Sequence, residues 1–217
     1  MSPITEHVNG GAKDKILLVE GRDDCFVVLH LCKQAECSSL AFSISASGDI
    51  ERVKRQAKTR LHGAEPLERL GLIIDADEQP IEERWQAFRG LLEPHGFDLP
   101  PSPSESGTIT ESNGKKAGIW IMPNNRDNGA LEDFLLQLAD HDGRDAATAY
   151  IKDSMNSRAA KLNPIHKSKG IAHAYLAIQE NPGQPFGTAI TSKAFEVDAK
   201  LAKSFTNWLT ALFGSDT

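Results

Sequence analysis

Cysteine is scarce in this sequence: 217 residues contain only Cys25, Cys32 and Cys37, and no two of them form a CxxC pair. The odd count argues against the disulfide framework of a small secreted domain, and the spacing argues against a structural zinc site. Long apolar runs are also missing, since no stretch approaches the ~20 residues that cross a membrane. Residues 1–15 lack the apolar core of a signal peptide. We therefore expect a cytoplasmic protein without a membrane partner.

An excess of basic charge is absent as well. The formal net charge is −6, with 24 Lys and Arg against 30 Asp and Glu. This balance argues against a uniformly basic nucleic-acid coat, so any contact with nucleic acid must come from local patches. The hydrophobic share of 40% is ordinary for a globular protein and supplies a core of useful size.

Short apolar runs alternate with amphipathic stretches up to residue 139. The runs at 15–20, 40–44, 70–74 and 118–122 suit strands that are buried on both faces. The stretches between them carry the apolar spacing and the start signals of helices. This alternation predicts an α/β fold with a mostly parallel four-stranded sheet flanked by helices.

The same patterns divide the chain into three parts. We expect a flexible leader over residues 1–14, an α/β domain over 15–139 and a helical C-terminal extension over 140–217 that packs on the domain. Residues 96–117 are rich in Pro, Ser and Gly, which predicts a surface insertion with a hairpin around residues 112–114.

Acidic side chains follow the apolar runs at the points where they end. Glu20 ends the first run, and Asp75 ends the third with Asp77 two residues on. Glu132 follows the fourth run. Ligands gather at the carboxyl ends of parallel strands, and carboxylates that meet there raise each other's pKa by like-charge repulsion. Bound Mg²⁺ or Mn²⁺ removes that penalty, because hard cations prefer oxygen ligands. The pattern therefore predicts a divalent-metal site for phosphodiester chemistry on nucleic acid.

The Asp-x-Asp spacing suits a single ion. Residues two apart on an extended strand end point to the same side, so Asp75 and Asp77 can bind one cation directly or through water. Such an ion stabilises charge on a phosphate and activates water. Glu20 then either ligates the same ion or acts as general acid or base.

The two motifs together resemble the Toprim domain, named for topoisomerases and primases. Residues 16–24 read Ile-Leu-Leu-Val-Glu-Gly-Arg-Asp-Asp, which matches an apolar strand ending in Glu-Gly with an Asp three residues after the glycine. Residues 72–77 read Leu-Ile-Ile-Asp-Ala-Asp and match the family's second strand. The resemblance spans about residues 15–139. The stretches 119–124 and 129–134 make the chain most similar to small stand-alone Toprim proteins related to the overcoming-lysogenization-defect nucleases.

This resemblance implies a Toprim-like fold with a particular division of roles. Glu20 would serve as general acid or base, and Asp75 and Asp77 would hold Mg²⁺. Asp24 matches the Asp of the first motif and would order that turn or contact a metal-bound water, and Glu132 is a further candidate ligand. The sequence departs from many Toprim domains in having no glycine three residues after the second Asp.

Among the reactions of Toprim proteins, hydrolysis suits this chain best. A topoisomerase needs a nucleophilic tyrosine on a separate module, and the two tyrosines, Tyr150 and Tyr175, lie in helix-like segments where packing is the expected role. A primase needs a longer chain and usually a zinc module. Related nucleases place a lysine after the acidic motifs to stabilise transition-state charge. Lys167 and Lys169 both fit this position, and we assign the catalytic role to Lys169.

Local basic patches lie in two places. The helix expected over residues 49–62 carries Arg52, Arg55 and Lys58, which we expect to contact phosphates, although a solvated helix face accounts for them equally well. The second patch lies at residues 158–169. It includes Lys167, which we expect to contact nucleic acid there.

Two other functions stay open. The chain could be a non-catalytic metal- or nucleic-acid-binding module that acts with a protein partner or as a homo-oligomer. It could also be a small-molecule phosphohydrolase, because Asp-x-Asp sites also act on phosphate esters.

Overall fold

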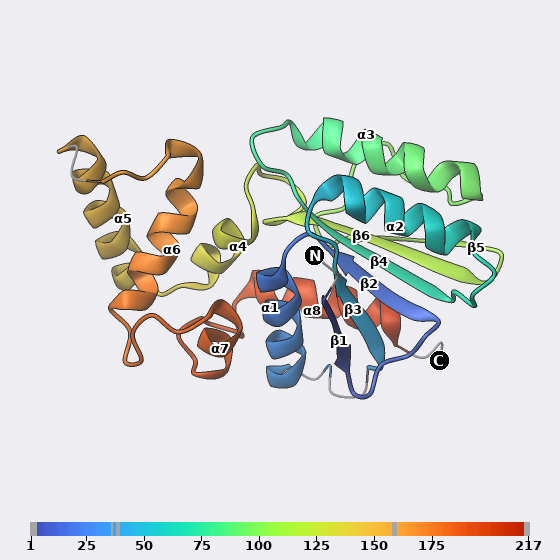
Figure 1. The fold of residues 1–217 in the computed structure, drawn as a ribbon, viewed down its shortest axis with the longest axis horizontal. Helices are drawn as coiled ribbons and strands as arrows, with labels where there is room; N and C mark the ends of the chain where they lie inside the picture. The colour runs from blue at the N-terminus through green and yellow to red at the C-terminus, as the bar shows by residue number, and fades with distance from the viewer. Residues whose placement is uncertain (1–3, 36, 38–39, 158–159, 215–217) are drawn as a thin grey trace.

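The computed structural model describes residues 4–35, 37, 40–157 and 160–214. The described residues form an α/β fold around one mixed sheet of six strands, with the order β1-β3-β2-β4-β6-β5 (Figure 1). The strands are β1 (Ile4–Val8), β2 (Lys15–Val19), β3 (Phe42–Ala46), β4 (Arg69–Asp75), β5 (Thr108–Ser112) and β6 (Lys115–Met122).

The four central strands are parallel, whereas β1 and β5 lie antiparallel at the two edges. The parallel arrangement explains the unbroken apolar runs of β2 and β4, since each strand is buried on both faces. From β2 the chain moves outward to β3, and it then returns to the other side of β2 as β4. The strand order therefore reverses between β2 and β4, and a ligand-binding crevice is expected at their carboxyl ends.

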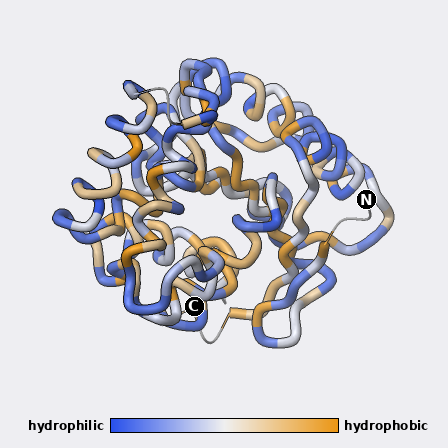
Figure 2. The backbone as a smooth tube through the Cα atoms, turned by 60° about the vertical axis from the view of Figure 1, so that its left-hand side comes forward, coloured by the Kyte–Doolittle hydropathy of each residue, from blue (hydrophilic) through white to orange (hydrophobic). Residues whose placement is uncertain are grey.

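The helices cover both faces of the sheet. They are α1 (Arg22–Gln34), α2 (Ile50–His62), α3 (Ile81–Leu92), α4 (Leu131–Leu138), α5 (His141–Asn156), α6 (Lys167–Ala177), α7 (Phe186–Thr191) and α8 (Lys200–Phe213). Figure 1 shows α2 and α3 over one face and α1 and α8 over the other, with α5 and α6 beyond one end of the sheet. Figure 2 shows hydrophilic and hydrophobic residues alternating along the turns of the outer helices, as amphipathic packing requires.

The prediction of four strands is wrong, because both sheet edges carry a further strand. Residues 4–8 are not part of a flexible leader: β1 pairs with β3, and Asn9, Gly10 and Gly11 form the turn after it with positive φ angles. The surface insertion likewise contributes β5, which pairs with β6 through the hairpin predicted around residues 112–114. Both edge strands are short and half-polar, so neither gives the long apolar run of a central strand.

Helix α8 packs closely on the sheet because two glycines lie beneath it. Gly71 on β4 and Gly118 on β6 are paired neighbours in the sheet register. A Cβ atom built on Gly118 would lie 2.7 Å from Leu212 Cδ2 of α8, and one on Gly71 would lie 3.1 Å from the same atom. Leu212 is fully buried at this contact.

The C-terminal helices share one hydrophobic core with the sheet. A continuous cluster of buried side chains links Leu17 and Phe42 of the sheet to Trp208 of α8, Ile171 of α6 and Ala147 of α5. A second cluster lies under α2 and α3 on the opposite face. Within the described ranges, no helix is both long and apolar enough to cross a membrane.

Candidate active site

The acidic residues gather where the strand order reverses. Glu20 directly follows β2, and Asp75 is the last residue of the neighbouring parallel strand β4. The backbone N–H of Asp75 donates a hydrogen bond to Glu20 Oε1 over 2.9 Å. The backbone N–H of Gly48, after β3, donates to the carbonyl oxygen of Glu20 over 2.7 Å. Glu20 is thus held by the strands on both sides of it.

Asp24 lies behind Glu20 in the first turn of α1. Its side chain is 5% exposed, and its Oδ2 accepts a hydrogen bond from the backbone N–H of Gly21 over 3.1 Å. This hydrogen bond closes the turn between β2 and α1. Burial, together with the nearby charge of Glu20, raises the pKa of Asp24 to about 7.

Asp75 lies close to several other carboxylates. Burial raises its pKa well above the usual value, and the charges of Asp24, Glu20, Asp77 and Glu132 raise it further. Its Oδ1 is buried and has no hydrogen-bond partner among the described residues. Such an atom is costly unless something compensates it. The pKa of Glu20 is also raised, mainly by burial.

Asp77 does not continue the strand, which corrects one step of the sequence argument. Strand β4 ends at Asp75, and Asp77 has a φ of 55°, in the left-handed region. Its N–H and C=O instead pair with Gly129. The rule that residues two apart point to the same side therefore does not apply here. Asp77 Oδ2 accepts a hydrogen bond from Arg84 Nη2 over 2.8 Å, and Arg84 Nε donates to the carbonyl oxygen of Ala76.

The carboxylates fit a hard cation in chemistry, although they do not form a closed cage. Within the described part of the chain, no three or more His, Cys, Asp or Glu side chains are arranged to hold a metal ion. Mg²⁺ needs fewer protein ligands, because it keeps several waters and often uses one or two carboxylates. The unpartnered Oδ1 of Asp75 is a suitable oxygen ligand, and a bound cation would compensate its burial. The donor set therefore fits Mg²⁺ or Mn²⁺.

A cleft of about 700 Å³ opens beside Asp75 and Asp77. Its acidic wall comes from the sheet edge and the start of α4, with Asp75, Asp77, Glu78, Glu132 and Asp133. Its opposite wall is the segment from Pro164 to Lys169 at the start of α6. The cleft therefore places an acidic wall against a basic one.

The two predicted lysines lie on the basic wall. Lys169 Nζ is 3.5 Å from Glu132 Oε1, so this pair joins the two walls. The Lys169 side chain is 51% exposed, and Lys167 is exposed at the beginning of the helix. The structure brings Asp75, Asp77 and Glu132 to the same cleft as both lysines.

Three residues that were not predicted from the sequence hold this arrangement in place. Arg84 pairs with Asp77, as described above. Asp133 Oδ2 accepts from the backbone N–H of Ala130 at the start of α4, while its Oδ1 accepts from the Ser168 hydroxyl over 2.6 Å. Asp133 thus ties the starts of α4 and α6 together. Its position in the first turn of a predicted helix was the available signal, whereas nothing local marked Ser168 or Arg84.

The basic residues of α2 lie outside the cleft. Arg52 is in the first turn of α2 and pairs with Asp49, and both side chains are about half exposed. Arg55 and Lys58 line a separate shallow depression on the outer face of the helix. The structure thus separates these three residues from the wall that carries Lys167.

Comparison with known families places almost the whole chain in one group. The family model described as "Protein of unknown function (DUF3226)" matches residues 14–214. The chain belongs to this family. Because the match begins near β2 and ends just after α8, the family unit includes the C-terminal helices as well as the sheet. No curated protein and no solved structure matched the chain.

Proposed function

We propose that the chain is a divalent-metal-dependent phosphodiesterase that hydrolyses nucleic acid and has a Toprim-like fold. The observation that carries this proposal is the buried, unpartnered Oδ1 of Asp75 at the β2–β4 reversal point, on a cleft whose far wall is basic. An acidic wall suits a cation, and the facing lysines suit the phosphate that the cation would bind. The resemblance of the Glu20 and Asp75–Asp77 motifs to Toprim domains points to the same chemistry.

In this proposal Asp75 and Asp77 hold Mg²⁺ or Mn²⁺, with Glu132 as an outer ligand. When bound, the metal stabilises negative charge on the phosphate and lowers the pKa of a bound water. Glu20 acts as general acid or base, a role that its raised pKa favours because the proton is then exchanged closer to neutral pH. Lys169 moves away from Glu132 and neutralises charge on the phosphate. Lys167 contacts the nucleic-acid strand beside this phosphate.

A cleavage assay tests this function. Supercoiled plasmid, single-stranded DNA and single-stranded RNA are incubated with the purified chain and Mg²⁺ or Mn²⁺. We expect Asp75→Asn and Glu20→Gln to slow cleavage by about 10²-fold or more, the usual scale for acid–base groups. Asp98→Asn, an exposed Asp outside the cleft, serves as the control and should cleave at the wild-type rate. Equal rates in wild type and Asp75→Asn would exclude the proposal.

One observation favours a second candidate, a non-catalytic binding subunit. Asp77 and Glu132 are already paired with Arg84 and Lys169, so the ligands are partly occupied by cations of the chain itself. A partner protein that displaces these cations would complete the site. Mn²⁺ binding by calorimetry without turnover of any nucleic acid, or of an aryl phosphate ester, would support this alternative.

A further inference from the structure

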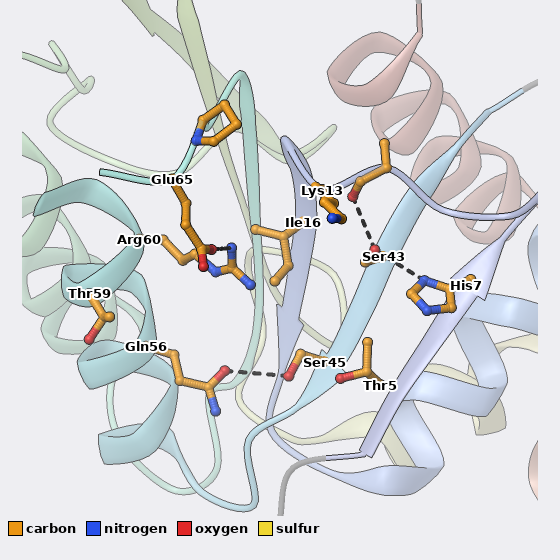
Figure 3. A pocket seen from close by; sticks show the side chains of 12 residues that line it. Thr5, His7, Lys13, Ile16, Ser43, Ser45, Gln56, Thr59, Arg60 and Glu65 are labelled. Atoms are coloured by element: carbon orange, nitrogen blue, oxygen red, sulfur yellow. Dashed lines mark hydrogen bonds and ion pairs between the residues drawn. The ribbon is translucent and has the colours of Figure 1, made fainter. Parts of the chain in front are cut away.

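A second concave surface lies between α2 and the β1–β3 edge of the sheet, and it shares no lining residue with the acidic cleft. It encloses about 770 Å³. Helix α2 connects β3 to β4 and packs over β2 and β4. Among the described residues, no helix covers the same face of β1 and β3. Figure 3 shows side chains from α2 and from both strands pointing into the space between them.

The floor of this groove is polar, unlike the other face of the same strands. On β1 and β3, the residues Val8, Phe42 and Ile44 are buried in the main core. The alternate positions form two rows across the sheet: His7 pairs with Ser43, and Thr5 pairs with Ser45. Four polar side chains therefore form the floor of the groove.

Hydrogen bonds fix the roles of these floor residues. The Ser43 hydroxyl donates to the carbonyl oxygen of Ala12 over 3.1 Å, so its contact with His7 Nδ1 needs the proton on Nδ1. Neutral His7 then presents Nε2 as a free acceptor. The Ser45 hydroxyl donates to Gln56 Oε1 over 3.4 Å. The Gln56 amide N–H groups have no partner among the described residues and remain free to donate.

The groove carries a small excess of positive charge within an acidic protein. Lys13 and Arg60 line it together with one carboxylate, Glu65. Arg60 Nη1 pairs with Glu65 Oε2 over 2.6 Å, but the Glu65 side chain is 76% exposed. An exposed ion pair of this kind contributes little and exchanges readily. Lys13 has no ion-pair partner within the described residues. It is therefore an uncompensated positive charge on a chain whose net charge is −6.

We propose that this groove binds a single strand of nucleic acid, with Lys13 and Arg60 at its phosphates. His7 Nε2 accepts from a sugar hydroxyl or a base, and the Gln56 amide donates to a base or phosphate oxygen. The groove lies between one helix and two strands, and a single strand rather than a duplex is its proposed occupant. Positive charge along a groove and an exposed ring, here Lys13, Arg60 and the His7 imidazole, are elements of a single-strand site.

The end of β3 links the floor of the groove to the backbone of Glu20. Ser45 lies two residues before Ser47, whose N–H donates to Val19 of β2, and Gly48 donates to Glu20. At about 3.3 Å per residue, the end of the groove is therefore within about 10 Å of the Glu20 backbone along the strand.

Fluorescence anisotropy with labelled 12-mers of oligo(rU) and oligo(dU) in EDTA tests the groove. We expect Lys13→Glu and Arg60→Glu each to weaken binding at least fivefold. Each should also make log K depend less steeply on log salt, by the amount that corresponds to the loss of about one phosphate contact. Gln56→Glu keeps the acceptor for Ser45 and adds a charge, and should weaken binding similarly. The control Lys152→Glu makes the same charge change on exposed α5 and should stay within twofold of wild type.

Three results would overturn the proposal. The first is equal affinity of the groove variants and Lys152→Glu. The second is a 12-bp duplex that binds as tightly as either single strand, and the third is full competition by uridine monophosphate at the same nucleotide concentration. Preference for oligo(rU) over oligo(dU) that is lost in His7→Ala would assign His7 Nε2 to the 2′-hydroxyl. Because binding is measured without metal, a failure of the groove to bind would not contradict the proposed hydrolysis. An absence of cleavage would likewise not contradict binding in the groove.

Discussion

The backbone N–H of Asp75 donates to Glu20 Oε1 over 2.9 Å, which joins the ends of two neighbouring parallel strands through a carboxylate. The bond has two consequences. It gives the Glu20 side chain a fixed direction at the place where the strand order reverses, and it satisfies a backbone donor at the end of β4. Glu20 therefore has a structural role that can be separated experimentally from its proposed chemical one.

Replacing Glu20 separates the two roles. Glu20→Gln keeps an amide oxygen that can accept from Asp75 N–H, whereas Glu20→Ala removes the acceptor. We expect Glu20→Ala to lower the free energy of unfolding by about 1–3 kcal/mol, the cost of an unsatisfied partly buried donor. Glu20→Gln should stay close to wild type or exceed it above neutral pH, because it removes a charge from the acidic group. Urea denaturation at pH 7.5 measures both variants, and equal stabilities would contradict the role assigned to this bond.

The buried carboxylates make stability depend on pH in a defined direction. Burial and the charge of Glu20 raise the pKa of Asp24 from 3.8 in the unfolded chain to about 7. Between these values the folded chain binds more protons than the unfolded chain, so the free energy of unfolding falls as pH rises from about 4 to about 7. The slope is up to about 1.4 kcal/mol per pH unit for this group.

Asp24→Asn tests that dependence, because asparagine keeps an acceptor for Gly21 N–H without the charge. In EDTA, we expect the variant to be more stable than wild type at pH 8, with a difference that shrinks toward pH 4. Urea denaturation across this range, with exposed Asp98→Asn as the control, measures the effect. A difference between Asp24→Asn and wild type that is constant with pH would rule out the titration of Asp24 as its cause.

The parallel core of the fold was predictable because each central strand is buried on both faces. Its apolar run is then continuous, and the residue that ends the run lies at the carboxyl end of the sheet, as with Glu20 after β2 and Asp75 at the end of β4. Edge strand β1 has no such signal. It contributes Thr5 and His7 to an open face, so five residues of mixed polarity resemble a loop.

The remaining parts of the site depend on contacts that local patterns do not contain. Ser168 meets Asp133 across 35 residues of sequence, and the pairing depends on how α6 docks on α4. The φ of 55° at Asp77 follows from its pairing with Gly129, another distant residue. A sequence pattern reports spacing along the chain, and these positions are set by tertiary structure instead.

The ion pair between Arg84 and Asp77 predicts that lysine cannot replace Arg84. The Arg84 side chain is 10% exposed and bonds both Asp77 Oδ2 and the Ala76 carbonyl oxygen. A lysine has no planar fork that reaches both groups. We expect Arg84→Lys to lower the free energy of unfolding by about 1–3 kcal/mol. Arg89→Lys on the same helix is the matched control, since Arg89 makes a surface pair with Glu93, and it should cost no more than about 0.5 kcal/mol. Equal losses of unfolding free energy in the two variants would show that Arg84 does not stabilise the acidic wall.

The close packing of α8 on the sheet predicts opposite effects for two Gly→Ala substitutions. At Gly118 the new methyl group would lie 2.7 Å from Leu212 Cδ2 and 3.1 Å from Trp208 Cζ2, both on buried side chains of α8. We expect Gly118→Ala to lower the free energy of unfolding by about 1–3 kcal/mol, as overpacking does. Gly90 lies inside α3, and a methyl group there meets no atom within 4 Å. Gly90→Ala should therefore raise stability by about 0.5–1 kcal/mol through helix propensity. Thermal and urea unfolding of both variants measures the contrast, and a Gly118→Ala variant as stable as wild type would show that α8 can shift away from the sheet without cost.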